Sequence, residues 1–119
     1  MVSIIMCLHR IPSLTRAEFQ QYWAMTHKPL VIERAGILRI AENSQLHTLT
    51  HQVAPERLLI RGLPLAYDRI AKATFRALDD LLAAGRSPCA ARAAAELIED
   101  EMKFIDRSRS PLFVVHDLG

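Results

Sequence analysis

The order of strand-like and helix-like segments predicts an α+β domain of the ferredoxin-like kind. In this fold a four-stranded antiparallel sheet carries helices on one face. The first observation is the order itself, which runs β-α-β-β-α-β. The second is a pair of strong helix-start signals, at Thr15 and at Ser87. The third is a length of 119 residues with 50% hydrophobic side chains, which suits one domain spanning residues 1–119.

Four segments have the composition of strands. The first is nearly all apolar, as expected for a strand covered on both faces. The second alternates, but both of its faces carry polar groups, which indicates that they line something. The predicted strands are residues 2–9, 37–49, 67–75 and 112–116.

The first helix begins with a capping box, since Thr15 is followed three residues later by Glu18. Leu14 and Phe19 form the hydrophobic pair that flanks such a start. Pro29 disfavours helical geometry at the preceding residue, which predicts a kink or a stop there. A short helical stretch over 30–35 then ends at Gly36.

The second helical region has two parts. A short helix over 78–84 ends at Gly85, and a longer one restarts with Ser87 and Pro88 and continues towards residue 105. Its apolar stripe is predicted to comprise Leu97, Ile98, Met102, Phe104 and Ile105. Its acidic residues are expected mostly to form a solvated face; they are Glu96, Glu99, Asp100 and Glu101. Asp100 and Glu101 are expected to make charge or helix-end contacts without a catalytic role. Residues 50–66 are irregular, with one helical turn expected at 55–60.

Composition and charge exclude several classes of protein. The net charge is +2 and no dense Lys/Arg stripe is present, so a nucleic-acid partner is not expected. No apolar run approaches the ~20 residues that span a bilayer, and the start lacks the basic region of a signal peptide. Cys7 and Cys89 are far apart without metal-ligand spacing, which favours a reducing, cytoplasmic setting.

The predicted sheet has one face without helices. Such apolar strands in so small a domain need a partner over that face. A second copy of the chain is the economical solution, so the sequence predicts a homodimer with facing sheets.

The candidate catalytic residue is His27, which lies four residues after Trp23 on one helical face. Imidazole titrates near neutrality and can transfer protons on a carbonyl-containing ring substrate. The alternative is a histidine that only caps the helix end. Trp23 is expected to stack on a ligand or to pack in the core, and Tyr22 is its alternative for either position.

Further ligand-binding candidates come from the predicted strands. Glu42 and Asn43 lie on opposite faces of the second strand, so at most one of them belongs to a given face. Tyr67 begins the third strand, where it serves either ligand binding or dimer contacts. His47 and His51 have only a weak metal-ligand spacing, so no metal and no cofactor is expected.

Several patches of the chain together resemble the EthD-like family of the dimeric α+β barrel superfamily. The first helix resembles that family's W-x-x-x-H-x-P pattern through Trp23, His27 and Pro29. Further patches are Tyr67-Asp68-Arg69-Ile70-Ala71, Leu78-Asp79-Asp80-Leu81-Leu82, Asp100-Glu101-Met102-Lys103-Phe104-Ile105-Asp106 and Phe113-Val114-Val115.

The chain departs from the family pattern on two strands. Ile40 stands where an aromatic residue is common, and Ser44 stands where a histidine is common. Arg69, Lys72 and Thr74 replace a usual glycine, acid and tryptophan. Family chemistry that needs the second-strand histidine is therefore not carried over.

The resemblance implies a pocket between sheet and helices in each subunit, binding a small hydrophobic organic ligand. It implies a metal-free acid/base enzyme of the cyclase, isomerase or decarboxylase type, acting on a hydrophobic carbonyl or aromatic compound through His27. The alternative is a non-catalytic ligand-binding or accessory protein of an oxygenase or ether-degradation system. A third, weaker reading is haem binding through a histidine, because the wider superfamily has haem-using relatives.

Overall fold

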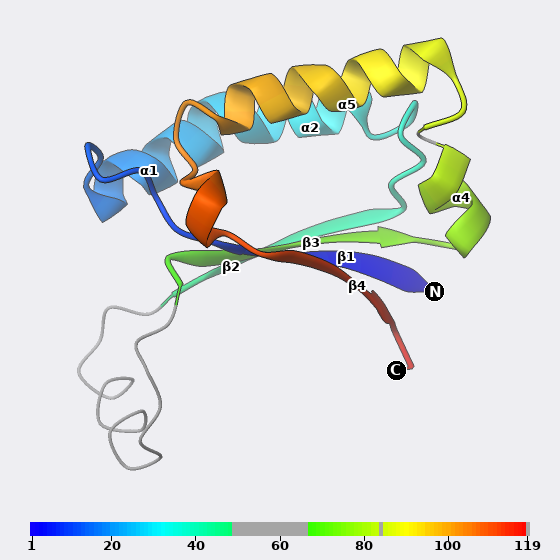
Figure 1. Ribbon diagram of the computed structural model, residues 1–119, viewed down its shortest axis with the longest axis horizontal. Coiled ribbons are helices and arrows are strands. Elements are labelled where there is room, and N and C mark those ends of the chain that lie inside the picture. Colours follow the sequence, from blue (N-terminus) through cyan, green and yellow to red (C-terminus); the bar gives the residue numbers. More distant parts are fainter. Residues whose placement is uncertain (49–66, 84, 119) are drawn as a thin grey trace.

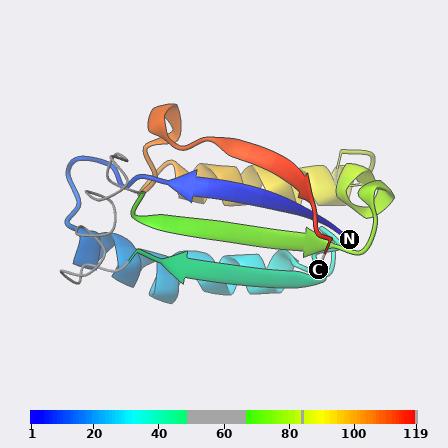
Figure 2. The same cartoon turned by 90° about the horizontal axis from the view of Figure 1, so that it is seen from below.

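A computed structural model describes residues 1–48, 67–83 and 85–118, and it contains a four-stranded antiparallel sheet with helices on one face (Figure 1). The strands are β1 (Val2–Leu8), β2 (Glu42–His47), β3 (Arg69–Phe75) and β4 (Leu112–His116). They lie side by side in the order β2-β3-β1-β4, with β1 and β3 in the centre (Figure 2). This topology confirms the predicted ferredoxin-like fold.

The helix layer contains α1 (Arg16–Tyr22), η1 (Trp23–His27), α2 (Lys28–Arg34), α4 (Leu78–Ala83) and α5 (Pro88–Glu101). A short 3₁₀ turn, η2 (Arg107–Arg109), leads into β4. Helix α5 lies beside the continuous unit formed by α1, η1 and α2, above the sheet (Figure 1). None of the helices in the described residues is long and apolar enough to span a membrane.

Both predicted helix starts are confirmed. The Thr15 hydroxyl accepts a hydrogen bond from the Glu18 N–H at 3.1 Å, and the Glu18 carboxylate accepts one from the Thr15 N–H at 3.0 Å. Ser87 accepts a hydrogen bond from the Ala90 N–H at 3.1 Å, with Pro88 at the first helical position. Each cap of this kind stabilises its helix by about 1 kcal/mol.

The first helix does not stop at Pro29. Instead the backbone widens into a π-helical turn, η1, in which the Lys28 N–H donates to the Trp23 carbonyl. Lys28 itself remains helical, with φ −55° and ψ −46°. Proline has no N–H to donate within a helix. The shift of the hydrogen-bond register in the π-turn takes up this loss, so the helix departs from α geometry just before Pro29.

Several predicted boundaries differ in the structure. Residues 37–41 are not a strand, because Leu38 and Ile40 donate backbone hydrogen bonds to Arg34 and Ala35 at the end of α2. Arg39 adopts a left-handed φ of 59° in this turn. Strand β1 ends at residue 8 and β3 begins at residue 69, and helix α5 ends at residue 101. The expected turn at 55–60 lies outside the described residues.

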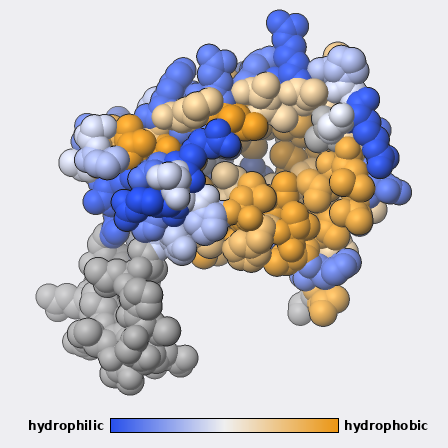
Figure 3. Space-filling view, in the orientation of Figure 1, coloured by the Kyte–Doolittle hydropathy of each residue, from blue (hydrophilic) through white to orange (hydrophobic). Residues whose placement is uncertain are grey.

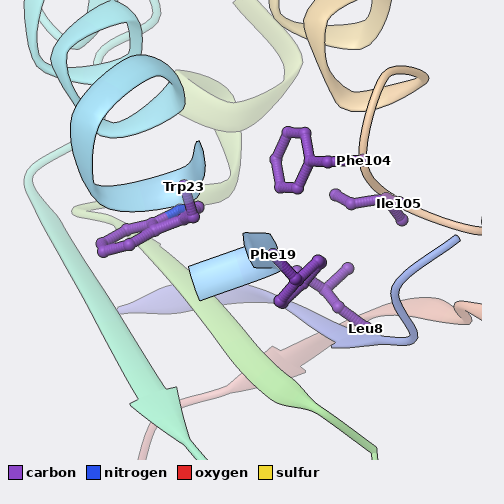
Figure 4. Close-up of a cluster of buried hydrophobic side chains, with 5 residues drawn as sticks. All are labelled: Leu8, Phe19, Trp23, Phe104 and Ile105. Atoms are coloured by element: carbon purple, nitrogen blue, oxygen red, sulfur yellow. The ribbon is translucent and has the colours of Figure 1, made fainter. Parts of the chain in front are cut away.

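The main core lies between the helix layer and the sheet. Leu8, Phe19, Trp23, Phe104 and Ile105 form one buried cluster, with the Phe19 and Phe104 rings 5.5 Å apart (Figure 4). Burying a side chain of this size stabilises the fold by about 1.5–3 kcal/mol. A second cluster contains Leu38, Ala90 and Ala93. The predicted apolar stripe is wrong for Met102, which is 56% exposed because α5 ends at Glu101. Ile98, inside the helix, is 39% exposed but lines the cavity described below.

The sheet face opposite the helices carries exposed apolar side chains. The strand register places Leu46 of β2 and Phe113 of β4 on this face, and they are 57% and 47% exposed. Strand β4 lies at the sheet edge, and Leu112 and Val114 on its other side are also exposed. Apolar surface accordingly gathers over the sheet side of the molecule, below the helices (Figure 3).

Candidate functional site

A cavity of about 620 Å³ lies between the helix layer and the sheet. Its opening is visible between the two layers (Figure 3). Apolar side chains from every strand except β2 and from both long helical units form most of its wall; they include Ile4, Met6, Leu8, Trp23, Val31, Ala71, Ala73, Phe75, Leu97 and Leu112. Polar groups enter at a few points, which is typical of small-molecule sites.

His27 lines this cavity from the π-turn η1 and is only 6% exposed. Its Nδ1 lies 2.8 Å from Oδ2 of Asp100, and its ring packs 5.0 Å from that of Phe104. Because a carboxylate oxygen only accepts, the neutral imidazole carries its proton on Nδ1. Nε2 then keeps its lone pair for proton transfer.

Asp100 is held by a second hydrogen bond. The Tyr22 hydroxyl donates to Asp100 Oδ1 at 2.7 Å, and the carboxylate is 4% exposed. Burial and the bond to Asp100 raise the pKa of Tyr22 to about 12. Although burial alone would raise the pKa of Asp100, the hydrogen bonds from Tyr22 and His27 lower it. The result is a chain of hydrogen bonds from Tyr22 through Asp100 to His27, which fixes the imidazole ring.

Burial lowers the pKa of His27 below its ordinary value of 6.5, against the opposing effect of Asp100. The positive charge of Arg69 acts in the same direction as burial. His27 is therefore neutral at neutral pH, which is the form that accepts a proton.

Glu101 also lines the cavity, with a side chain that is 16% exposed. Its Oε1 lies 3.9 Å from His27 Nε2. The predicted solvated face is thus wrong for Asp100 and Glu101, whereas the charge contacts expected of them are present. These residues occupy the last turn of α5, where the helix end meets η1, and only the packing of the two elements brings them to His27.

Trp23 forms part of the cavity wall and stacks on Arg69. The guanidinium carbon lies 3.8 Å from the centre of the indole ring, and Nη2 is 3.0 Å from His47 Nδ1. Arg69 is fully buried, and its Nε and Nη1 have no hydrogen-bond partner among the described residues. Burial lowers the pKa of Arg69 to about 10.

His47, the first histidine of the predicted metal-ligand pair, lies beside the Arg69 side chain. The second histidine of the weak metal-ligand pair, His51, lies outside the described residues. Within the residues that the structure describes, no group of three or more His, Cys, Asp or Glu side chains is arranged to hold a metal ion.

Strand β2 contributes Asn43 to the cavity, whereas Glu42 is exposed on the opposite face. Gln45, two residues after Asn43, also lines the cavity and donates to Asn43 Oδ1 at 3.0 Å. Gln45 Oε1 is buried without a partner among the described residues. Gln45 was not among the predicted site residues, although its alternation with Asn43 on the strand was a signal for it.

Tyr22 and Tyr67 lie away from the described cavity wall. Tyr22 instead packs on Phe104, with ring centres 5.0 Å apart, because its hydroxyl is committed to Asp100. Tyr67 packs on His9 at 4.6 Å, just before β3 begins. Of the predicted residues, the structure therefore brings His27, Trp23 and Asn43 together at the cavity.

The fold and this cavity can be compared with known proteins. Residues 11–108 match the model of the EthD domain. The conidial pigment biosynthesis dehydratase EthD of the fungus Metarhizium robertsii is 30% identical over 115 residues, covering 88% of this chain and 74% of that protein.

Solved structures show the same fold at low sequence identity. An ethyl tert-butyl ether D (EthD) family protein from Bacillus halodurans superposes with a TM-score of 0.64 at 14% identity, covering 99% of this chain and 100% of its own. A dimeric protein of unknown function with a ferredoxin-like fold, from Bacteroides fragilis, has a TM-score of 0.60 at 9% identity, covering 98% and 95%.

A third structure is a variant of SnoaB, a cofactor-independent oxygenase from Streptomyces nogalater. Its TM-score is 0.55 at 13% identity, with coverage of 99% of this chain and 93% of its own. The domain match over residues 11–108 and the 30% identity to the Metarhizium dehydratase together show that this chain belongs to the EthD family.

Proposed function

We propose that this chain is an enzyme that transfers protons on a hydrophobic carbonyl or aromatic compound bound in the cavity, without a metal or organic cofactor. The observation that carries the proposal is the setting of His27. A buried imidazole is fixed by Asp100 through Nδ1 and lines an apolar cavity of about 620 Å³. That volume falls in the range of small-molecule sites.

In this proposal His27 Nε2 removes a proton from the carbon next to a carbonyl group. Asp100 holds the ring and stabilises the imidazolium that forms, and Tyr22 holds Asp100 in turn. Trp23 supplies a flat apolar wall, and Asn43 supplies an amide at the cavity edge. Positioned general bases of this kind accelerate reactions by roughly 10²–10⁴-fold.

The names of two similar proteins agree with such chemistry. The Metarhizium relative is named a dehydratase, and the Streptomyces structure is named a cofactor-independent oxygenase. Both names describe reactions on small molecules. The dehydratase is the stronger support, because its identity of 30% is higher than that of the solved structures.

The second candidate function is ligand binding without chemistry, as an accessory to an oxygenase. One observation favours it: Ser44 stands at the position of the family's second-strand histidine and is exposed on the face away from the cavity. The chain therefore lacks the family's second-strand histidine, although position 44 itself faces away from His27 and the cavity. Turnover by the isolated protein would exclude this candidate.

We also propose that the chain is a homodimer joined through the sheet face opposite the helices. Leu46 and Phe113 are exposed on that face. The Bacteroides structure of the same fold is named dimeric. Pairing of two such faces removes apolar surface from water.

The test of the catalytic proposal is hydrogen exchange on a ketone that has no leaving group. Benzylacetone is incubated with the protein in D₂O, and loss of its α-proton signals is followed by NMR. Wild type is expected to accelerate exchange, and His27→Gln is expected to lose that acceleration. His116→Gln is the matched control, since this exposed histidine lies on β4. A folded His27→Gln protein with full activity contradicts the proposal.

A further inference from the structure

The cavity contains a second group suited to proton transfer beside His27. Asp100 and Glu101 are the last two residues of α5, and they reach different nitrogens of the same imidazole. Asp100 accepts from Nδ1 at 2.8 Å, while Glu101 Oε1 lies 3.9 Å from Nε2. One helix end therefore fixes the ring with one carboxylate and places a second carboxylate at its reactive side.

Glu101 and His27 are close without being bonded to each other. Their separation of 3.9 Å exceeds the 2.7–3.2 Å of an N–H···O hydrogen bond. Both side chains line the same cavity. The space beside both tips is thus available to a reacting group that exchanges protons with each of them.

The surroundings of Glu101 favour its protonated form. The groups that face it are His27 from η1, Asp100 from its own helix and Arg107 from η2. Burial raises the pKa of Glu101 to about 7; Arg107 opposes this shift and the charge of Asp100 adds to it. Among the described residues, no Lys or Arg side chain lies within ion-pair distance of this carboxyl.

The two neighbours therefore differ in protonation near neutral pH. Burial lowers the pKa of His27 and raises that of Glu101. Near neutral pH the pair therefore combines a neutral imidazole that accepts a proton with a partly protonated carboxyl group whose acid form donates one. Titratable groups whose environments separate their pKa values in this way mark an acid and a base.

We propose that Glu101 is the general acid that protonates a leaving hydroxyl while His27 removes the neighbouring carbon-bound proton. The substrate class is then a β-hydroxy carbonyl compound with an apolar or aromatic body, and the reaction is elimination of water. This inference rests on the proposed function of His27 and adds to it the reaction class.

The step balances without a further reactant. His27 Nε2 takes the proton from the carbon between the carbonyl and the carbinol, and the C–H electron pair becomes the new C=C bond. The C–O bond breaks, its electrons stay with the oxygen, and Glu101 supplies the proton that completes water. Transfer of the proton from His27 to Glu101 then restores both groups. Because base and acid lie on one side of the substrate, hydrogen and hydroxyl leave from the same face.

The test compares two reactions on related ketones. The first is α-proton exchange of benzylacetone, which needs only the base. The second is dehydration of the benzaldehyde–acetone aldol to benzalacetone, which needs base and acid and is followed by ultraviolet absorbance. Glu101→Gln is expected to retain exchange and to lose dehydration by roughly 10²-fold or more. His27→Gln is expected to lose both.

A substrate with a better leaving group separates a catalytic role from a structural one. The acetate ester of the same aldol releases acetate, which needs no proton to depart. Glu101→Gln is expected to eliminate acetate at a rate close to that of wild type. Glu99→Gln, an exposed acid on the same helix, is the matched control and should leave all three reactions unchanged.

The outcomes distinguish the two proposals. Wild type that exchanges benzylacetone but does not dehydrate the aldol overturns the role of Glu101 and leaves that of His27 intact. Dehydration by Glu101→Gln at the wild-type rate, or equal losses with the hydroxyl and acetate substrates, overturns it as well. Wild type that catalyses no exchange overturns the proposed function itself.

Discussion

At the scale of single residues, Asp100 decides which nitrogen of His27 faces the cavity. Its Oδ1 accepts from Tyr22 at 2.7 Å, so Oδ2 is left for His27. A carboxylate accepts at both positions, whereas an amide in the same orientation accepts at one and donates at the other. Asp100 therefore determines that the neutral His27 ring carries its proton on Nδ1.

The variant Asp100→Asn tests this role. With its amide oxygen bonded to Tyr22, the Asn side chain presents an N–H to Nδ1 and moves the imidazole proton to Nε2. The exchange of benzylacetone is expected to fall by roughly 100-fold. Folding is checked by circular dichroism. Unchanged exchange in a folded variant would contradict the role given to Asp100.

Arg69 is a second residue that acts on His27. Burial is the larger cause of the lowered His27 pKa, and the charge of Arg69 adds to it. Arg69→Met is expected to raise the pKa of His27, measured by NMR titration of the ring protons. Exposed Arg39, changed to Met, is the control. A His27 pKa that stays constant or falls in Arg69→Met would contradict the electrostatic role.

The sequence identified some of these residues and missed others for a physical reason. The spacing of Trp23, His27 and Pro29 predicted the cavity edge, because those residues lie within one helical unit. Asp100 lies 73 positions from His27, and Glu101 one further. In an amphipathic helix an acidic run indicates a solvent face, and only the tertiary packing of α5 against η1 reverses that indication.

At the scale of elements, the entry into β3 is tied to the first helix through Asp68. This carboxylate is 5% exposed and accepts hydrogen bonds from the Arg10 backbone at 3.0 Å and from the Arg16 side chain at 2.9 Å. The Arg10 side chain adds an ion pair. Asp68 thereby joins the end of β1, the start of α1 and the start of β3.

Asp68→Asn is expected to lower the free energy of unfolding by about 3 kcal/mol, because two cations lose a buried partner. Burial alone would raise the pKa of Asp68, but the bonds from Arg10 and Arg16 lower it below its ordinary 3.8. A carboxylate with a lowered pKa stabilises the fold above that ordinary value, and the contribution is lost as the pH falls.

Denaturant unfolding of wild type and variant measures this effect. The difference between them is expected to be full at neutral pH and to shrink as the pH falls through 3.8. Exposed Asp79, changed to Asn, is the control. A difference that is independent of pH would contradict the assignment of this stability to the ionised carboxylate.

Element types were easier to predict than their ends. The capping residues Thr15 and Ser87 use local hydrogen bonds, so the helix starts follow from the sequence. The π-turn replaces the α-helical hydrogen-bond register just before Pro29, and no local sequence signal identifies that replacement. The turn at Arg39 and the late start of β2 depend on how α2 ends, which alternation along the strand does not reveal.

At the scale of the whole molecule, one layer of helices covers one face of the sheet and leaves the other exposed (Figure 2). The order of helices and strands along the chain predicted the ferredoxin-like sheet and its uncovered face. Which residues remain exposed there depends on the register between strands, as for Leu46 and Phe113. A charged substitution at Phe113 therefore tests the dimer proposal.

Phe113→Asp is expected to weaken the dimer by roughly 30-fold or more, because it places a charge in an apolar interface. Light scattering over a concentration series measures the change. Met25→Asp is the control, since this 74% exposed residue lies on the helix layer. A monomeric wild type, or a variant as dimeric as wild type, would contradict an interface through this face.

The central claim is that neutral His27 is the base of the cavity, and its most direct test is the pH dependence of benzylacetone exchange. The same samples are titrated by NMR to follow the His27 ring. The exchange rate is expected to rise with pH at the midpoint of the His27 titration, below its ordinary value of 6.5. A rate that does not follow this titration, or that persists in folded His27→Gln, contradicts the claim.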